Sequence, residues 1–262
     1  MITIQNYVRA KSLEEAWQLN QSKKNRIMGG MLWLRLGRGS VNTAIDLCEL
    51  GLDSIEETEE QFSIGAMVTL RDLEKHSGLN EYTDNAVSDA VKSIVGVQFR
   101  NMATVGGSLW GRLGFSDVLT VFLATDAYVE LYKGGIVPLE QFARMKPDGD
   151  ILVRLIVKKR PCKMVYSSVR NQKTDFPVLT CAVSCVDGEY RAVIGARPTK
   201  ARPVKDSEGI LADGITEKSA CEFARFVVGQ VPTGSNIRGS AQYRAHLVRV
   251  LTERAVKSIG GI

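Results

Sequence analysis

Two glycine pairs stand where this sequence could bind phosphate. Gly29–Gly30 directly follows the short apolar run Arg26–Met28. Gly106–Gly107 is flanked by the hydroxyl residues Thr104 and Ser108. Backbone N–H groups that point outward together bind phosphate well, and glycine permits the necessary backbone angles without a Cβ in the way. A helix that begins directly after such a loop adds its partial positive end. Both pairs could therefore converge on one diphosphate.

Other chemistries find little support in the residues. A glycine pair alone is more often a plain turn. The sequence contains no G-x-G-x-x-G, G-x-x-x-x-G-K-[ST] or G-x-S-x-G motif, which disfavours the dinucleotide fingerprint, the P-loop and the serine-hydrolase elbow. The only histidines, His76 and His246, lie among charged residues and are expected at the surface, and no Cys/His group suggests a zinc site. Such a chain indicates chemistry supplied by a cofactor.

The composition is that of an ordinary globular protein. Of 262 residues, 44% are hydrophobic and 24% are charged, and the net charge of +5 includes no block of five or six like charges. A nucleic-acid partner is therefore disfavoured. No apolar run approaches the roughly 18 residues of a membrane span, and the first residues lack a signal peptide's plan, so we expect a cytoplasmic protein. The five cysteines are not grouped like cluster ligands, and we expect reduced thiols that serve as small buried hydrophobes.

The elements around the first glycine pair form a small α/β block. Ser12 with Glu15 predicts a capped helix, and apolar runs predict short strands on either side of the glycines. In this block we predict strands over 3–8, 26–28 and 44–47, a helix over 13–21 and a helical turn over 32–36 that ends at Gly37.

The second glycine pair lies in a further α/β block. Thr69 with Asp72 predicts one helix cap and Ser116 another. Here we predict strands over 62–66, 127–131 and 151–157, helices over 85–95 and 116–124, and a glycine-rich turn over 103–108.

The basic stretch Lys158–Pro161 predicts a domain boundary. Residues 1–160 would form one domain with lobes of about 1–55 and 56–160, and residues 161–262 a second. In the second domain, Asp187–Gly188 between two β-rich runs predicts a hairpin. The elements predicted there are strands over 178–185 and 190–194, a helix over 217–228 and another after Ser240.

The glycine loops and their neighbours resemble a known family, the FAD-binding subunit of molybdenum hydroxylases, the group of xanthine dehydrogenase and carbon monoxide dehydrogenase. The family's first loop reads roughly A-G-G-T-D-L after a strand, and here the segment is Met28–Leu32. The second reads roughly Q-I-R-N-x-A-T-V-G-G-N, and here it is Gln98–Ser108. Ser116–Asp117 and Asp175–Pro177 are similar too, so the resemblance spans nearly the whole chain.

The resemblance implies an α+β fold. A two-lobed FAD-binding domain of the PCMH-like type would be followed by a smaller α/β domain with a three-stranded antiparallel sheet and helices. Backbone amides of both loops would hold the pyrophosphate, Asp117 a ribose or ribityl hydroxyl, and Ile94 and Leu152 the flavin or adenine. The FAD-binding residues that it implies are Ile27, Met28, Gly29, Gly30, Met31, Leu32, Trp33, Ile94, Ala103, Thr104, Gly106, Gly107, Ser108, Ser116, Asp117 and Leu152.

The resemblance also implies a function. A partner subunit with molybdenum cofactor would oxidise the substrate, a second partner with [2Fe–2S] clusters would relay electrons, and FAD on this chain would pass them to NAD or another acceptor. Two alternatives remain: a stand-alone FAD oxidase, and a scaffold subunit that has lost FAD, given that Met31 and Leu32 replace polar residues. A Gly106→Val variant is expected to lose FAD and keep its fold.

Overall fold

The computed structural model describes residues 2–262. The chain packs into two compact units, each built from segments that are not contiguous in sequence. The first unit contains the residues up to Asp72, Val97–Gly111 and Ala127–Val157; the second contains Leu73–Gly96, Arg112–Asp126 and Lys158–Ile262. The domain boundary near residue 160 stays a prediction, but two segments that it assigns to the first domain pack with the C-terminal part of the chain.

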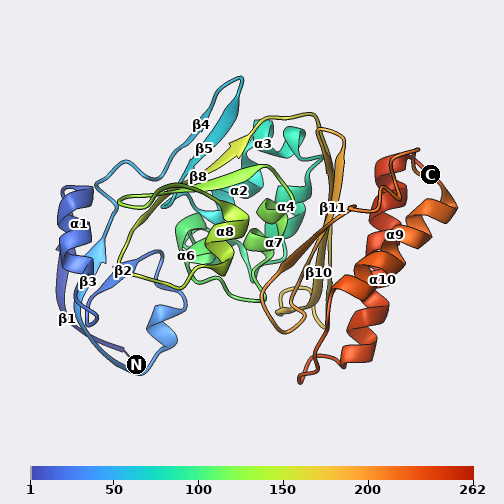
Figure 1. Ribbon diagram of the computed structural model, residues 1–262. Helices are drawn as coiled ribbons and strands as arrows, with labels where there is room; N and C mark the ends of the chain where they lie inside the picture. Colours follow the sequence, from blue (N-terminus) through green and yellow to red (C-terminus); the bar gives the residue numbers. More distant parts are fainter. Residues whose placement is uncertain (1) are drawn as a thin grey trace. The chain divides into compact units, whose positions relative to one another are not determined.

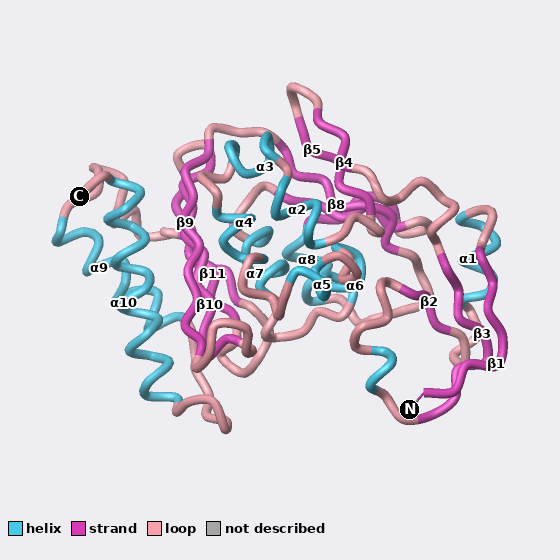
Figure 2. The backbone as a smooth tube through the Cα atoms, turned by 180° about the vertical axis from the view of Figure 1, so that it is seen from behind, coloured by secondary structure: helices cyan, strands magenta, loops and turns pink. Residues whose placement is uncertain are grey.

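A three-stranded parallel sheet opens the first unit. Its order is β1-β3-β2, with bounds Ile2–Arg9, Gly39–Asp46 and Arg26–Met28. Helix α1 (Leu13–Asn20) lies along one face (Figures 1 and 2), where Ala16 and Ile45 are fully buried. The Ser12 hydroxyl caps this helix by accepting from the amide of Glu15 at 3.1 Å. The predicted strands and capped helix are confirmed, and the strand predicted at 44–47 is the end of the longer β3.

A five-stranded sheet forms the rest of the first unit's framework. Its order is β4-β5-β8-β6-β7, with bounds Ile55–Glu57, Gln61–Gly65, Leu152–Lys158, Ala127–Leu131 and Gly135–Pro138. Three of these strands confirm the predictions at 62–66, 127–131 and 151–157. Helix α6 (Val105–Trp110) packs against β5 and α8 (Leu139–Arg144) against β6. This packing places the second glycine pair next to the sheet.

The second unit is layered. Its antiparallel sheet has the order β12-β11-β10-β9, with bounds Arg202–Lys205, Glu189–Gly195, Pro177–Val186 and Cys162–Arg170. One face packs against α4 (Ala86–Val91) and α7 (Asp117–Leu123), and the other is covered by α9 (Glu217–Gln230) and α10 (Ala241–Gly260), as Figure 1 shows. The mixed α+β class is confirmed. The three long strands are those that the resemblance implies, and β12 adds a short fourth.

The hairpin predicted at Asp187–Gly188 in the second unit is confirmed. Asp187 and Gly188 both have positive φ, 52° and 80°, and join β10 to β11 in a tight hairpin.

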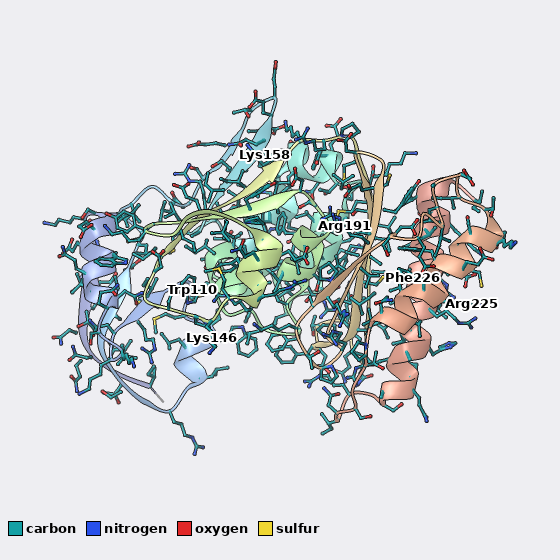
Figure 3. All side chains as sticks on the ribbon, in the orientation of Figure 1. Trp110, Lys146, Lys158, Arg191, Arg225 and Phe226 are labelled. Atoms are coloured by element: carbon teal, nitrogen blue, oxygen red, sulfur yellow. The ribbon has the colours of Figure 1, made fainter. Side chains whose placement is uncertain are left out.

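The His76 Nδ1 accepts from the Leu79 amide at 3.0 Å and caps α3 (Ser77–Tyr82), so this histidine has a structural role. On α9, two adjacent side chains have different environments (Figure 3). Arg225 is exposed, whereas the Phe226 ring packs against that of Phe223, with 6.3 Å between the ring centroids.

The helix predicted over 85–95 is too long. Helix α4 ends at Val91, and Val95 adopts a left-handed φ of 50°. A side chain at positive φ places its Cβ against the following carbonyl, so no α-helix continues through such a residue. Nowhere between residues 2 and 262 is there a helix both long and apolar enough to cross a membrane.

Cysteine burial differs from the prediction. Cys181 lies in the core shared with α10 and is fully buried, which confirms the interpretation for this residue, whereas Cys48 is exposed. Burial raises the pKa of the Cys181 thiol to about 12. Because the thiolate is the nucleophile, we expect Cys181 to resist a disulfide reagent such as DTNB at pH 8 while Cys48 reacts. Mass spectrometry of the labelled protein, with a denatured control, checks this; labelling of native Cys181 as fast as Cys48 would contradict it.

Candidate functional site

The first glycine loop has a left-handed backbone. Gly30 and Met31 have φ of 67° and 59°, and a single 3-10 turn follows at η1 (Leu34–Leu36), which ends at Gly37. The helical turn predicted over 32–36, ending at Gly37, is confirmed: the Arg35 amide donates to the Met31 carbonyl at 3.0 Å, and η1 completes the turn. Because this turn is short, the loop would bind a phosphate with its own amides rather than with the end of a long helix.

Three consecutive amides of this loop are available to a ligand. Within residues 2–262, the N–H groups of Gly30, Met31 and Leu32 have no hydrogen-bond acceptor. The loop is partly exposed, although the Leu32 side chain is buried. Successive unpaired N–H groups in a turn form a concavity that suits an anion. The replacement of polar residues by Met31 and Leu32 leaves this backbone property intact.

The second glycine loop is the first turn of a helix rather than the predicted free turn. The Thr104 hydroxyl caps α6 by accepting from the Gly107 amide at 3.1 Å. The Gly106 amide donates to the Ala66 carbonyl at 2.8 Å. These two amides are already paired within the chain, so the loops are not equivalent: the unpaired donors lie in the first.

The two loops touch, although they are far apart in sequence. A Cβ built on Gly30 would lie 1.8 Å from the Met102 carbonyl oxygen, and one on Gly29 would lie 2.7 Å from the Thr104 Oγ1. A Cβ on Gly107 would lie 3.3 Å from the Gly29 carbonyl oxygen. Glycine is thus required here for the close approach of two backbones.

Gly106 has a different reason to be glycine. A Cβ at this position would lie 2.7 Å from the Ala66 carbonyl oxygen and 2.8 Å from the Ala66 Cβ. The structure contradicts the expectation that Gly106→Val spares the fold, because the added side chain would push α6 away from the segment after β5. The variants that test the site must be chosen elsewhere.

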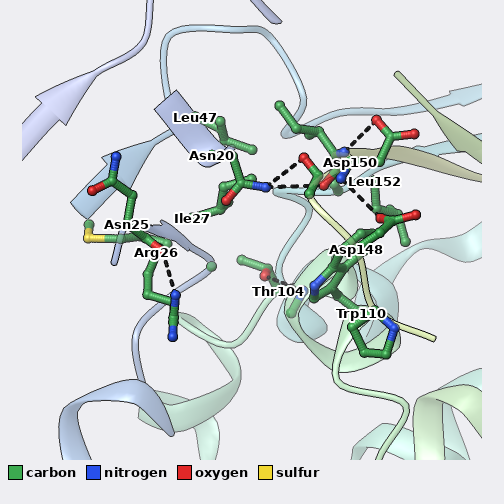
Figure 4. Close-up of a pocket in the computed structure, with 18 of the residues that line it drawn as sticks. Asn20, Asn25, Arg26, Ile27, Leu47, Thr104, Trp110, Asp148, Asp150 and Leu152 are labelled. Carbon is green, nitrogen blue, oxygen red and sulfur yellow. Dashed lines mark hydrogen bonds between the residues drawn. The ribbon is translucent and has the colours of Figure 1, made fainter. Parts of the chain in front are cut away.

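A cavity of about 630 Å³ opens beside the touching loops, entirely within the first unit. Figure 4 shows residues that line it, among them Asn20 and Trp110. Of the residues implied by the resemblance, the cavity is lined by Ile27, Met28, Gly29, Thr104, Gly106, Gly107 and Leu152. The remaining first-unit residues of that set, which belong to the same two loops but do not line the cavity, are Gly30, Met31, Leu32, Trp33, Ala103 and Ser108.

Further cavity walls come from residues that sequence reasoning missed. Two segments supply most of them, 20–26 at the end of α1 and 147–151 before β8. Trp110 also lines the cavity, and its ring packs 5.9 Å from that of Phe142, centroid to centroid. The Trp33 side chain is 49% exposed and contacts the Phe99 ring edge-on. The carboxamides at 20, 21 and 25 carried no motif, so only the tertiary structure could reveal them.

Ile94, Ser116 and Asp117 belong to the second unit. Ser116 caps α7 by accepting from the Leu119 amide at 3.1 Å. The buried Asp117 carboxylate accepts from the Arg170 guanidinium at 2.5 Å and from the Tyr166 hydroxyl. Burial raises the pKa of Asp117, while the Arg170 charge and these hydrogen bonds pull it down. Asp117 thus has strong partners of its own, and its role toward a cofactor hydroxyl stays a proposal.

Comparison with known proteins agrees with the architecture. A relative from Sulfolobus acidocaldarius, glyceraldehyde dehydrogenase medium chain, is 24% identical over 97% of this chain and 98% of its own length. The xanthine dehydrogenase FAD-binding subunit of Escherichia coli is 27% identical over 76% and 75%. Carbon monoxide dehydrogenase from Hydrogenophaga pseudoflava superposes with a TM-score of 0.85 at 21% identity, covering 97% of this chain and 96% of that one.

The family itself is identified by a model that spans most of the chain. The model describes the FAD-binding domain in molybdopterin dehydrogenase and matches residues 2–159, which contain both glycine loops and every wall of the cavity. The chain therefore belongs to the FAD-binding subunits of the molybdenum hydroxylases, and it is an oxidoreductase component whose cofactor is FAD.

Proposed function

We propose that this chain carries electrons through FAD between a [2Fe–2S] partner and NAD or another acceptor, in a complex whose molybdenum subunit oxidises the substrate. The names of its relatives, medium chain and FAD-binding subunit, support membership of such a complex. FAD, when bound, supplies exchange between one-electron and two-electron carriers. The protein's task is then to bind and orient the cofactor.

We propose that the cavity beside the two loops is part of the FAD site. The observation that carries this is the row of unpaired amides at Gly30, Met31 and Leu32, which directly follows Gly29 in the wall of the cavity. A diphosphate is the part of FAD that needs such donors, and backbone N–H groups bind it without a compensating cation. Gly29 would border the diphosphate on the same side as these amides, and Thr104, Gly106 and Gly107 would border it from the other side.

The remaining implied residues fit the same proposal in different roles. Apolar walls at Ile27, Met28 and Leu152 would contact the ring systems or ribose of FAD. The roles toward FAD that the resemblance implies for Ile94, Ser116 and Asp117 stay proposals. No residue in this proposal acts as a general acid or base, because the chain's part is placement and electrostatics.

The absorption spectrum of the native protein and the subunits that co-purify with it test the proposed function. We expect the chain, purified from its natural source, to show flavin absorption and to co-purify with a molybdenum subunit and an iron–sulfur subunit. We also expect the isolated chain not to oxidise a substrate by itself. A colourless chain that takes up no added FAD would favour the scaffold alternative, and unaided turnover would favour the stand-alone oxidase; either result overturns the proposal.

A further inference from the structure

The wall of the cavity formed by 147–151 lies outside the strands and helices and is held by side chains. Its backbone runs from α8 into β8. The Asp150 carboxylate accepts from the amides of Lys133, Gly134 and Ile151 at 3.0, 2.8 and 2.8 Å. The Asp150 amide in turn donates to the Asp148 carboxylate at 3.0 Å. One side of this segment is thus fixed to the turn that follows β6.

The other side is fixed by two carboxamides at the end of α1. The Asn20 Nδ2 donates to the carbonyl oxygens of Gly149 and Asp150, at 3.0 and 3.3 Å. The Gln21 Nε2 donates to the same Gly149 oxygen at 3.0 Å and to the Trp17 carbonyl at 2.9 Å. Figure 4 shows Asn20 reaching across toward Asp150. Both carboxamide residues line the cavity themselves.

We infer that Asn20 and Gln21 are positioning residues for FAD: they fix the 147–151 wall at the distance from the glycine loops that the cofactor requires. This inference rests on the proposed assignment of the cavity to FAD. A neutral carboxamide suits the task because it donates to carbonyl oxygens and brings no charge into a cavity beside the diphosphate. Gly149 fits this contact, since a Cβ there would lie 3.0 Å from the Gln21 Oε1.

The consequence is a specific effect on affinity. Without the Asn20 donor, two carbonyl oxygens lose a partner, and the wall can relax toward water instead of the cavity. The Gly149 oxygen keeps the Gln21 donor, but the Asp150 oxygen loses its carboxamide partner, which destabilises this wall in the empty protein. Asn20→Asp has a larger effect, since both of the new carboxylate oxygens would repel the carbonyl oxygens of Gly149 and Asp150. In such a variant the wall must return to its ordered conformation before it can contact FAD. This requirement weakens the apparent affinity for FAD.

The test compares Asn20→Asp with a matched control on the same helix, Gln18→Leu. The Gln18 side chain donates to Glu14 at 3.0 Å, is exposed, and does not line the cavity. Each protein, freed of flavin, is titrated with FAD by fluorescence, and amide exchange over 132–134 and 147–152 is followed without ligand. We expect Asn20→Asp to raise the FAD Kd at least about tenfold and to speed exchange in both segments, and Gln18→Leu to do neither.

Two outcomes overturn the inference and one overturns its premise. Faster exchange with an unchanged FAD Kd would mean that the wall does not serve the cofactor. Unchanged exchange would mean that Asn20 does not hold the wall. If the unaltered chain itself fails to bind FAD, the proposed function is wrong instead. Should Asn20→Asp fail to fold, Asn20→Ser removes the carboxamide with less repulsion, and the same two measurements on it decide.

Discussion

Replacing Gly30 with alanine is expected to abolish retention of FAD. The residue has a φ of 67°, and a Cβ would lie 1.8 Å from the Met102 carbonyl oxygen and 2.7 Å from its carbon. Neither group is a flexible side-chain end, so one backbone must move. The loops would separate, and the amides of residues 30–32 would lose their common direction. We expect the FAD Kd to rise by about 100-fold or more, equivalent to ~2.8 kcal/mol.

Gly135→Ala is the matched control for this variant. Gly135 has the same φ of 67°, but no atom lies within 4 Å of the position of its Cβ. Both variants therefore bear the cost of a left-handed alanine, about 1–2 kcal/mol, and only Gly30→Ala adds the collision between loops. Fluorescence titration with FAD and thermal unfolding of both variants separate the two costs. Equal FAD affinity in the two variants would show that contact between the loops does not support the site.

Replacing Arg170 with methionine is expected to lower the free energy of unfolding by about 3–5 kcal/mol. Arg170 and Asp117 are buried, with 7% and 6% of their side chains exposed, and their charged atoms lie 2.5 Å apart. Removal of the guanidinium leaves a buried carboxylate without its counter-charge. A suitable control is Arg238→Met, which breaks a more exposed pair with Asp175. Those two side chains are 31% and 35% exposed and lie 3.4 Å apart, so the loss should be about 1 kcal/mol or less.

The pH dependence of the Arg170→Met variant follows from the sign of the pKa shift. Burial already raises the Asp117 pKa, and loss of Arg170 removes the strongest influence that lowers it. A carboxyl whose folded-state pKa exceeds its unfolded value of about 3.9 binds its proton more tightly in the folded protein. The deficit should therefore be largest at neutral pH and shrink as pH falls through the raised pKa.

Chemical denaturation between pH 7 and pH 5 measures this dependence. The double variant Arg170→Met with Asp117→Asn should recover much of the lost stability at pH 7, because the amide is neutral and its oxygen can still accept from Tyr166. A deficit that stays constant with pH, or a double variant no more stable than Arg170→Met alone, would contradict this account of the pair.

Local sequence signals predicted much of the framework. Hydroxyl caps at Ser12, Ser116 and Ser240 mark helix starts, and Asp187–Gly188 marks a hairpin, because these features depend on residues within a few positions of one another. Where the sequence misled, the deciding contact was remote. The glycine-rich segment at 106–107 is helical because Thr104 caps it and the Ala66 carbonyl takes an amide, and no local pattern contains Ala66.

The same distinction between local and remote contacts decides which residues of the candidate site could be predicted. The glycines that line the cavity were identifiable because few other residues permit such close backbone contact. Asn20 and Gln21 were not, since a carboxamide at the end of a helix is common and acquires meaning only from the carbonyl oxygens of Gly149 and Asp150. The same holds for Asp117: its sequence position suggests a helix-start acid, and only the fold supplies Arg170 as its partner.

The contact between Gly30 and Met102 also has a consequence for how the protein is made. The first loop is completed by a segment synthesised much later, after the whole of the intervening sheet strands and short helices. Contacts between residues so far apart in sequence form slowly. The entropy cost of closing a large loop comes before the contact can stabilise the chain. During synthesis, the nascent chain therefore has no finished phosphate cradle until residue 102 has left the ribosome, and the cofactor can load only onto a chain already grown past that point.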